Sequence, residues 1–145
     1  MNITLINDDI IKGLENIEDD SIDLIFIDPP YNLGKKYKGT SDSWKNEEDY
    51  LNWCYKWLDI SIKKLKENGS MYFMCSTQYY AYFDIFLSKN LDIKSRIIWE
   101  YDSSGVQAKK HFGSLYEPII FAVKNKKKYT FNYLDIMIET KTGSV

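Results

Sequence analysis

The chain has 145 residues, of which 44% are hydrophobic and 16% aromatic, so we expect one domain with a packed core, and the composition excludes disorder overall. Its formal net charge is −2, but residues 1–30 hold eight acids and one lysine, whereas residues 31–145 hold thirteen acids and eighteen bases. The excess of positive charge therefore lies in residues 31–145, and its side chains could contact phosphate groups.

The two cysteines, Cys54 and Cys75, lie far apart in apolar surroundings. This favours buried free thiols in a reducing compartment over a disulfide or a metal site. No stretch approaches a membrane span, and the N-terminus has neither the basic nor the apolar region of a signal peptide. We therefore expect a cytoplasmic protein without a membrane partner.

The first expected elements are a short strand at residues 3–6 and a short helix capped by Asp8 or Asp9. The continuous apolar run at residues 24–27 is typical of a strand that is covered on both faces, as in a parallel sheet. It ends at Asp28-Pro29-Pro30-Tyr31, which holds two of the three prolines. Because proline lacks an N–H group and has a fixed φ, this segment ends the strand and holds a rigid backbone beside the carboxylate.

Residues 33–46 are polar and contain two glycines, which predicts a loop. Asn46 is expected to cap a helix through about residue 66, with Gly69 in a C-cap position. A strand at residues 70–75 follows, and then a helix that Thr77 is expected to cap and that runs to about residue 88.

The remaining expected elements are a strand at residues 92–101, a polar loop at 102–114 and a strand at 117–124. The lysines at 124–128 would close a hairpin into a last strand at 129–133. The alternation of strands and helices predicts an α/β fold with a mostly parallel, Rossmann-like sheet and a C-terminal antiparallel hairpin.

Asp28-Pro29-Pro30-Tyr31 after an apolar strand resembles the signature of amino-group DNA methyltransferases, which move a methyl group from S-adenosylmethionine to an exocyclic nitrogen of a base. The Asn7-Asp8 pair, residues 21–24, Asn32 and residues 111–118 extend the resemblance to the adenine-specific group of the β arrangement. The resemblance implies that residues 1–145 form the catalytic half of such an enzyme. Residues 33–46 and 102–114 would be active-site loops, and residues 134–145 would begin the target-recognition region.

The resemblance assigns catalytic roles to Asp28, Pro29, Pro30 and Tyr31. Adenine's amino nitrogen is a poor nucleophile, so the Asp28 carboxylate and the Pro29 carbonyl would accept its hydrogens, and Asp28 would stabilise the developing positive charge. Tyr31 would stack on a base that is extruded from the duplex. Contact with the cofactor would fall to Asp28 and to Asp8, although Asp8 can equally be a helix cap.

Contact with double-stranded DNA is expected from residues around both loops: Asn32, Lys35, Lys36, Lys38, Ser103, Lys109, Lys110 and His111. For the later loop, an ordinary solvated loop is the alternative. No spacing of histidine, cysteine or carboxylate side chains suggests a metal site.

The glycine-rich Phe-x-Gly-x-Gly-like stretch of the family, which allows a close approach to S-adenosylmethionine, does not occur in residues 1–145. We therefore interpret the chain as the first half of a β-type enzyme. The strand that ends at Asp28 would then expose an apolar edge, which a second copy or a complementing C-terminal half would cover.

The leading hypothesis is a site-specific adenine-N6 DNA methyltransferase of a restriction-modification system. A catalytically silent binding or assembly fragment is one alternative. Methylation of cytosine N4 is another, because aspartate in the first position favours adenine without excluding cytosine. Methylation of RNA by the same chemistry is a third.

Overall fold

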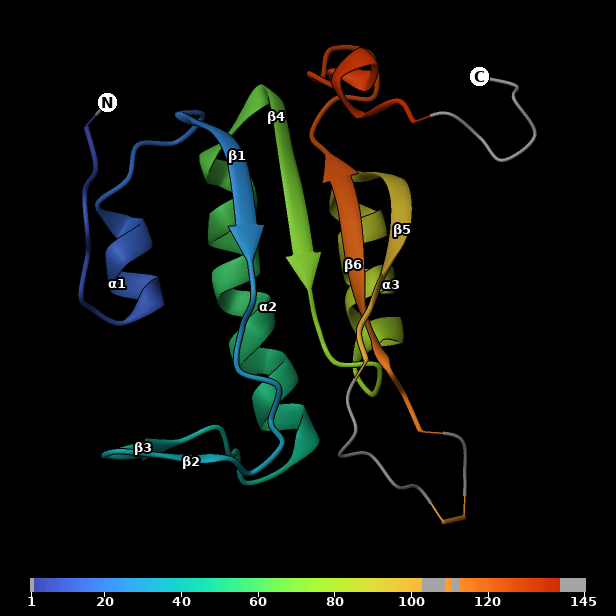
Figure 1. Cartoon of the computed structure of the whole chain (residues 1–145). Coiled ribbons are helices and arrows are strands. Elements are labelled where there is room, and N and C mark those ends of the chain that lie inside the picture. Colours follow the sequence, from blue (N-terminus) through green and yellow to red (C-terminus); the bar gives the residue numbers. More distant parts are fainter. Residues whose placement is uncertain (1, 103–108, 111–112, 139–145) are drawn as a thin grey trace.

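The computed structural model describes residues 2–102, 109–110 and 113–138, and its main feature is a four-stranded sheet of order β1-β4-β6-β5. The strands are β1 (Ile22–Ile27), β4 (Leu65–Met74), β5 (Asp92–Glu100) and β6 (Tyr116–Val123). Figure 1 shows α2 (Glu47–Lys64) and α3 (Tyr80–Asn90) on one face of the sheet, with α1 (Ile10–Glu15) beside β1.

The sheet is mixed, so the α/β class is confirmed but the mostly parallel sheet is wrong. Among the described residues, β1 and β4 are the one parallel pair, whereas β6 runs antiparallel to both of its neighbours, β4 and β5. The helix α3 carries the chain from β4 to β5, as expected for a crossover. The next strand then inserts between these two strands, and a pattern of alternating elements does not reveal such an insertion.

The hairpin expected at the end of the chain does not form. Residues 129–132 are not a strand, and Tyr133–Ile136 make a 3₁₀ helix, η1. The aromatic rings of this segment instead cover the sheet, since Phe131 stacks on Phe121 with centroids 5.8 Å apart and Phe121 stacks on Tyr72 at 4.6 Å. Packing onto an aromatic surface replaces strand pairing here.

The helix α1 begins as expected, but the strand before it is absent. Asp9 Oδ1 accepts a hydrogen bond of 3.0 Å from the Ile11 amide, which makes Asp9 the N-cap. Residues 3–6 form no strand, and Ile3 and Leu5 are largely exposed. A strand needs a pairing partner for its backbone groups, and within the described residues none lies beside this segment.

The boundaries of α2 and α3 differ in part from the expected ones. Asn46 caps α2 as predicted, because its Oδ1 accepts a 2.8 Å hydrogen bond from the Asp49 amide. α2 ends at Lys64 and runs directly into β4, so Gly69 is not a C-cap. α3 begins at Tyr80 without a side-chain cap, and the prediction of Thr77 as its cap is wrong.

Gly69 allows two strands to approach each other closely. A Cβ atom at this position would lie 2.9 Å from the Lys66 carbonyl oxygen and 3.0 Å from that of Ile22. Both atoms belong to the backbone and cannot move aside as a flexible side chain could. The start of β1 therefore rests directly against the bend in β4.

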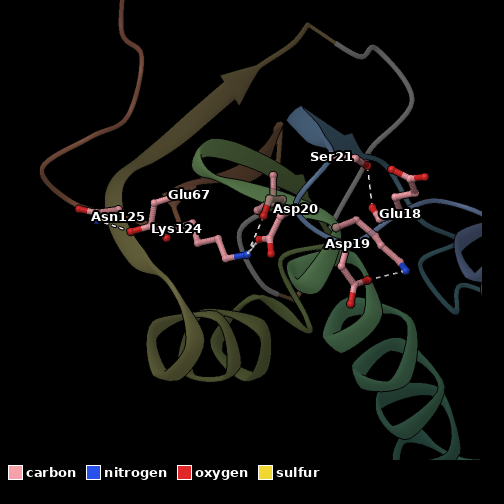
Figure 2. A network of polar contacts seen from close by, with 9 residues as sticks. Glu18, Asp19, Asp20, Ser21, Glu67, Lys124 and Asn125 are labelled. Atoms are coloured by element: carbon pink, nitrogen blue, oxygen red, sulfur yellow. Dashed lines mark hydrogen bonds and ion pairs between the residues drawn. The ribbon is translucent and has the colours of Figure 1, made fainter.

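A network of ion pairs and hydrogen bonds fixes the end of β1 that lies opposite Asp28 (Figure 2). Lys124 Nζ donates to Asp20 Oδ1 and to the Leu65 carbonyl, both at 2.6 Å. Lys64 Nζ contacts Asp19 Oδ1 at 2.7 Å, and this hydrogen bond lowers the pKa of Asp19. The network holds the connector before β1 against β4 and β6.

The loop expected at residues 33–46 contains a small hairpin, made of β2 (Lys36–Tyr37) and β3 (Thr40–Ser41). Gly39, with φ +86°, lies in its turn.

Within the described residues, no helix is both long and apolar enough to cross a membrane.

The outer edge of β1 pairs with no strand among the described residues. Leu24 and Phe26 of this strand are 57% and 61% exposed, so it is not covered on both faces as its apolar sequence suggested. Such a row of unpaired backbone groups is a template for pairing with another segment.

Candidate active site

Asp28 lies directly after β1, at the edge of the sheet where the neighbouring parallel strand β4 also ends. Ile27, the last residue of β1, pairs with Phe73 near the end of β4. The carboxyl ends of parallel strands form the edge at which open α/β sheets bind ligands. The fold therefore positions the Asp28 carboxylate where a ligand can reach it.

A hydrogen bond from α2 holds the proline segment that follows Asp28. The hydroxyl of Tyr50 donates to the Pro30 carbonyl at 2.8 Å, and Tyr50 is fully buried. Burial is also the main reason why the pKa of Tyr50 is raised. Tyr50 binds the carbonyl of Pro30. It does not bind the carbonyl of Pro29, which is the expected acceptor for a hydrogen of the base amino group.

Asn32 connects the segment to two other parts of the chain. Its Nδ2 donates to the Tyr79 hydroxyl at 2.9 Å, and its Oδ1 accepts from the Trp44 amide at 3.0 Å. It also adopts a φ of +57°, a left-handed conformation that asparagine tolerates better than most residues. Both groups of the amide are thus used inside the protein, and the role of Asn32 in DNA binding stays a prediction.

Asp42 is a residue of this region that the sequence reasoning missed. It is only 4% exposed, and its carboxylate accepts hydrogen bonds from the amides of Leu33 and Lys35. These bonds hold the loop before the β2–β3 hairpin against the proline segment. An acid that follows two glycines in a polar loop was the available signal, because aspartate often binds nearby backbone amides in turns.

The Tyr31 hydroxyl contacts two carboxylates. It lies 2.7 Å from Asp28 Oδ1 and 3.1 Å from Oε2 of Glu117, a residue of β6. Burial, followed by the hydrogen bond to Asp28, raises the pKa of Tyr31, so its hydroxyl keeps its proton at neutral pH. Glu117 falls within the stretch that resembles the family, but the sequence reasoning gave it no role.

A polar cavity of about 370 Å³ opens at these side chains. Its wall combines the proline segment, the loop that follows it and the start of β6: Asp28, Pro29, Pro30, Tyr31, Leu33, Lys35, Tyr37, Asp42 and Glu117. Carboxylates and an aromatic side chain are therefore presented to one space. Such a wall suits a flat molecule that carries N–H groups.

A second, mostly apolar cavity of about 600 Å³ lies along the open edge of β1, between that strand, α1 and α2. Asp28, Pro29 and Pro30 line this cavity as well as the polar one. Asp9 lines it too, whereas Asp8 is exposed and its Oδ1 accepts the Asp9 amide at 2.8 Å. The expected contact of Asp8 with the cofactor stays a prediction.

The structure brings together only some of the predicted DNA-binding residues. Lys35 lines the polar cavity, and Lys36 and Lys38 are exposed in the hairpin beyond it. Lys109 and Lys110 are also exposed, in a short described piece of the predicted loop. Ser103 and His111 lie outside the described residues.

The described part of the chain contains no group of three or more histidine, cysteine, aspartate or glutamate side chains that could hold a metal ion. Cys54 and Cys75 are free and buried there, and burial raises the pKa of each thiol to about 12. They therefore act as apolar core residues and not as nucleophiles at neutral pH.

Comparison with known proteins identifies relatives over most of the chain. A sequence model of the N6/N4 family described as DNA methylase matches residues 22–144. The chain is 49% identical over 141 residues to the DNA adenine methyltransferase YhdJ of Escherichia coli (strain K12), an alignment that covers 97% of this chain and 48% of that protein. It is 36% identical over 143 residues to the type II methyltransferase M.HpaI of Haemophilus parainfluenzae, covering 97% and 45%.

A similar fold occurs in the crystal structure of the M1.HpyAVI–SAM complex, with a TM-score of 0.58 and 22% identity. That match covers 88% of this chain and 57% of the other. The chain thus spans about half the length of the curated relatives that it matches.

Proposed function

Because the chain belongs to the N6/N4 DNA methylase family, we propose that it forms the catalytic half of an enzyme that transfers a methyl group from S-adenosylmethionine to the N6 amino group of adenine in DNA. The single observation that carries the proposal is the shared wall formed by Asp28, Pro29 and Pro30. These three residues line both the polar cavity and the apolar cavity. A methyl acceptor and a methyl donor would meet across this wall.

The polar cavity suits an extruded base. The Asp28 carboxylate can accept one amino hydrogen, and the carbonyl of Pro29 can accept the other. Holding both hydrogens favours the tetrahedral geometry that the nitrogen needs in order to attack, and the carboxylate stabilises the positive charge that develops there. The ring of Tyr31 offers a stacking surface beside the Asp28 carboxylate.

The residues around the apolar cavity fit part of S-adenosylmethionine. The apolar side chains of β1, α1 and α2 could hold its adenine ring, and the carboxylates of Asp9 and Asp28 could face its polar and positively charged groups. When bound, the cofactor supplies an activated methyl group. The carboxylate of Asp28 would be the charged group shared by the two sites.

Two observations favour adenine over cytosine. The motif begins with Asp28, as in the adenine-specific pattern, and the relative that is 49% identical is a DNA adenine methyltransferase. The similarity to M.HpaI, a type II methyltransferase, supports a place in a restriction-modification system. We assign contact with the DNA backbone to Lys35, at the cavity, and to Lys36 and Lys38, on the adjacent exposed hairpin.

The open edge of β1 makes completion of the sheet part of the proposal. We propose that either a second copy of the chain or a complementing half covers this edge and the exposed side chains of Leu24 and Phe26. Light scattering of residues 1–145 tests self-association. A monomer at tens of micromolar, roughly the range in which exposed edges associate, would leave the complementing half as the cover.

The experiment for the proposed function is transfer of a radiolabelled methyl group from S-adenosylmethionine to duplex DNA and, in parallel, to RNA. The complete polypeptide should label DNA, and Asp28→Ala should reduce labelling strongly. Labelling of RNA alone would replace the DNA substrate by RNA. No labelling of either would favour the catalytically silent binding fragment.

A further inference from the structure

The hydroxyl of Tyr31 lies between two carboxylates, but it has only one proton to donate. Asp28 Oδ1 is the nearer acceptor at 2.7 Å, and Glu117 Oε2 lies 3.1 Å from the same hydroxyl oxygen. A phenol hydroxyl can direct its proton to one of these acceptors at a time. Asp28 and Glu117 therefore compete for the hydrogen bond from Tyr31.

The sheet holds the backbone of Glu117, and its side chain is half-buried. It pairs with Trp99 of β5, and the next residue, Pro118, accepts a 3.2 Å hydrogen bond from the Cys75 amide at the end of β4. Strands on both sides thus fix the backbone of Glu117, and its carboxylate oxygen Oε2 lies 3.1 Å from the Tyr31 hydroxyl. An acceptor carried by the sheet is therefore within reach of that hydroxyl.

We propose that Glu117 is a positioning residue of the methyl-transfer site: it offers the Tyr31 hydroxyl a second acceptor, and this frees Asp28 Oδ1 to receive the amino group of the target base. The inference rests on the proposed function, because it concerns the same carboxylate. Glu117 then determines how readily the Asp28 carboxylate accepts a hydrogen bond from the amino group of the base.

The exchange follows from the hydrogen-bonding capacity of the three groups. When an amino N–H group approaches Asp28 Oδ1, it shares that oxygen with the Tyr31 hydroxyl, and a shared oxygen is a weaker acceptor for each donor than an unshared one. A partly buried hydroxyl that loses its acceptor is destabilised, so Tyr31 needs another partner before it releases Asp28. Turning toward Glu117 supplies that partner, and since the pKa of Tyr31 is raised, the hydroxyl turns without losing its proton.

The other charged residues that line the cavity do not provide this second acceptor. Asp42 already binds the amides of Leu33 and Lys35. The side chain of Lys35 is a positively charged donor, so it cannot accept a hydrogen bond. Among the described residues that line the cavity, Glu117 is therefore the acid that contacts Tyr31 in addition to Asp28.

The test compares Glu117→Gln with the unchanged complete polypeptide in single-turnover methyl transfer to duplex DNA at saturating S-adenosylmethionine. A carboxamide keeps the shape but is a neutral and weaker acceptor, so we expect the transfer rate to fall about tenfold. The dissociation constant for DNA should stay within about twofold, because the exchange concerns the reacting group and not the phosphate contacts. Glu100→Gln, which removes an exposed carboxylate from the neighbouring strand β5, is the matched control and should keep the rate.

The decisive comparison adds the same change to a Tyr31→Phe background. Without the hydroxyl there is no competition for Asp28, so Glu117→Gln should then change the rate by less than about twofold. An equal loss in both backgrounds would overturn the proposal, because Glu117 would then act independently of Tyr31. A wild-type rate for Glu117→Gln, or weakened DNA binding at an unchanged rate, would overturn it as well. Absence of transfer by the unchanged polypeptide would instead reject the proposed function, and this inference with it.

Discussion

The hydroxyl of Tyr50 donates a 2.8 Å hydrogen bond to the carbonyl of Pro30, so a fully buried residue of α2 holds the segment that carries the candidate catalytic carboxylate. The site is therefore supported from the core of the molecule. Tyr50 also packs against the rings of Trp44 and Tyr79, with centroids 4.9 and 4.7 Å away. The aromatic core and the backbone of the candidate site meet at this side chain.

Removing this hydrogen bond should impair both stability and methyl transfer. Tyr50→Phe keeps the ring but leaves the Pro30 carbonyl without its donor, and we expect the free energy of unfolding to fall by about 1–3 kcal/mol. The transfer rate should fall with it, because Asp28 is held less firmly. Urea unfolding and single-turnover transfer measure the two effects.

Tyr55→Phe is the matched control for that change. Tyr55 lies on the same helix and stacks on Phe86 at 4.5 Å, a ring contact that the substitution keeps. Its stability and activity should remain close to those of the unchanged protein. If Tyr50→Phe behaved like Tyr55→Phe, the bond to Pro30 would not support the site.

Asn32 should act through the fold and not through DNA. Asn32→Ala removes the bonds to Tyr79 and to the Trp44 amide and places alanine at a positive φ, so we expect a loss of about 2–4 kcal/mol in the free energy of unfolding. Tyr79→Phe, which removes only one of these bonds, should lose about 1 kcal/mol. Urea unfolding checks both values, and weaker DNA binding by Asn32→Ala at unchanged stability would favour the direct DNA contact instead.

The sequence was most informative where the local pattern alone determines the structure. The apolar run before Asp28 predicted β1, and Asn46 with the apolar face of the following helix predicted α2. These elements place the motif at the end of a strand. Local capping and periodicity suffice for such features because they depend on neighbours within a few residues.

Features that depend on distant contacts could not be predicted in this way. The insertion of β6 between β4 and β5 is a choice of sheet order, and the position of Glu117 beside Tyr31 depends on it. The alternating aromatic residues at 129–133 have the period of a strand, but the ring of Phe131 packs on Phe121 of the sheet and the segment pairs with no strand that the structure describes. Gly69 had the sequence position of a helix cap and instead allows a backbone contact across the sheet.

Two glycine substitutions should have opposite effects. Gly69→Ala would place a Cβ atom 2.9 Å from the Lys66 carbonyl oxygen, so we expect a loss of about 1–3 kcal/mol in the free energy of unfolding. Gly13 lies inside α1, where a Cβ atom would meet Ile6 at an ordinary 3.5 Å. Gly13→Ala should therefore stabilise the fold by roughly 0.5–1 kcal/mol through helix propensity. Equal effects of the two changes in urea unfolding would contradict this account.

The cysteines should react only when the protein unfolds. Burial raises the pKa of Cys54 and Cys75 to about 12, so at pH 8 both remain thiols in the folded state and lack the reactive thiolate. The thiolate fraction would rise only as the pH approaches 12. Labelling with iodoacetamide at pH 8 should be very slow in buffer and rapid in urea. Rapid labelling of either cysteine in the folded protein would show that its side chain is accessible there.

The proposed reaction of the Asp28 site is methylation of the N6 amino group of adenine. Its most direct test is mass spectrometry of the nucleosides from duplex DNA that has been treated with S-adenosylmethionine and the complete polypeptide, either unchanged or carrying Asp28→Ala. We predict N6-methyladenine with the unchanged protein and a loss of at least about 100-fold with Asp28→Ala, the size of effect typical of removing a group that stabilises transition-state charge. N4-methylcytosine as the product, or N6-methyladenine at an undiminished rate with Asp28→Ala, would contradict the claim.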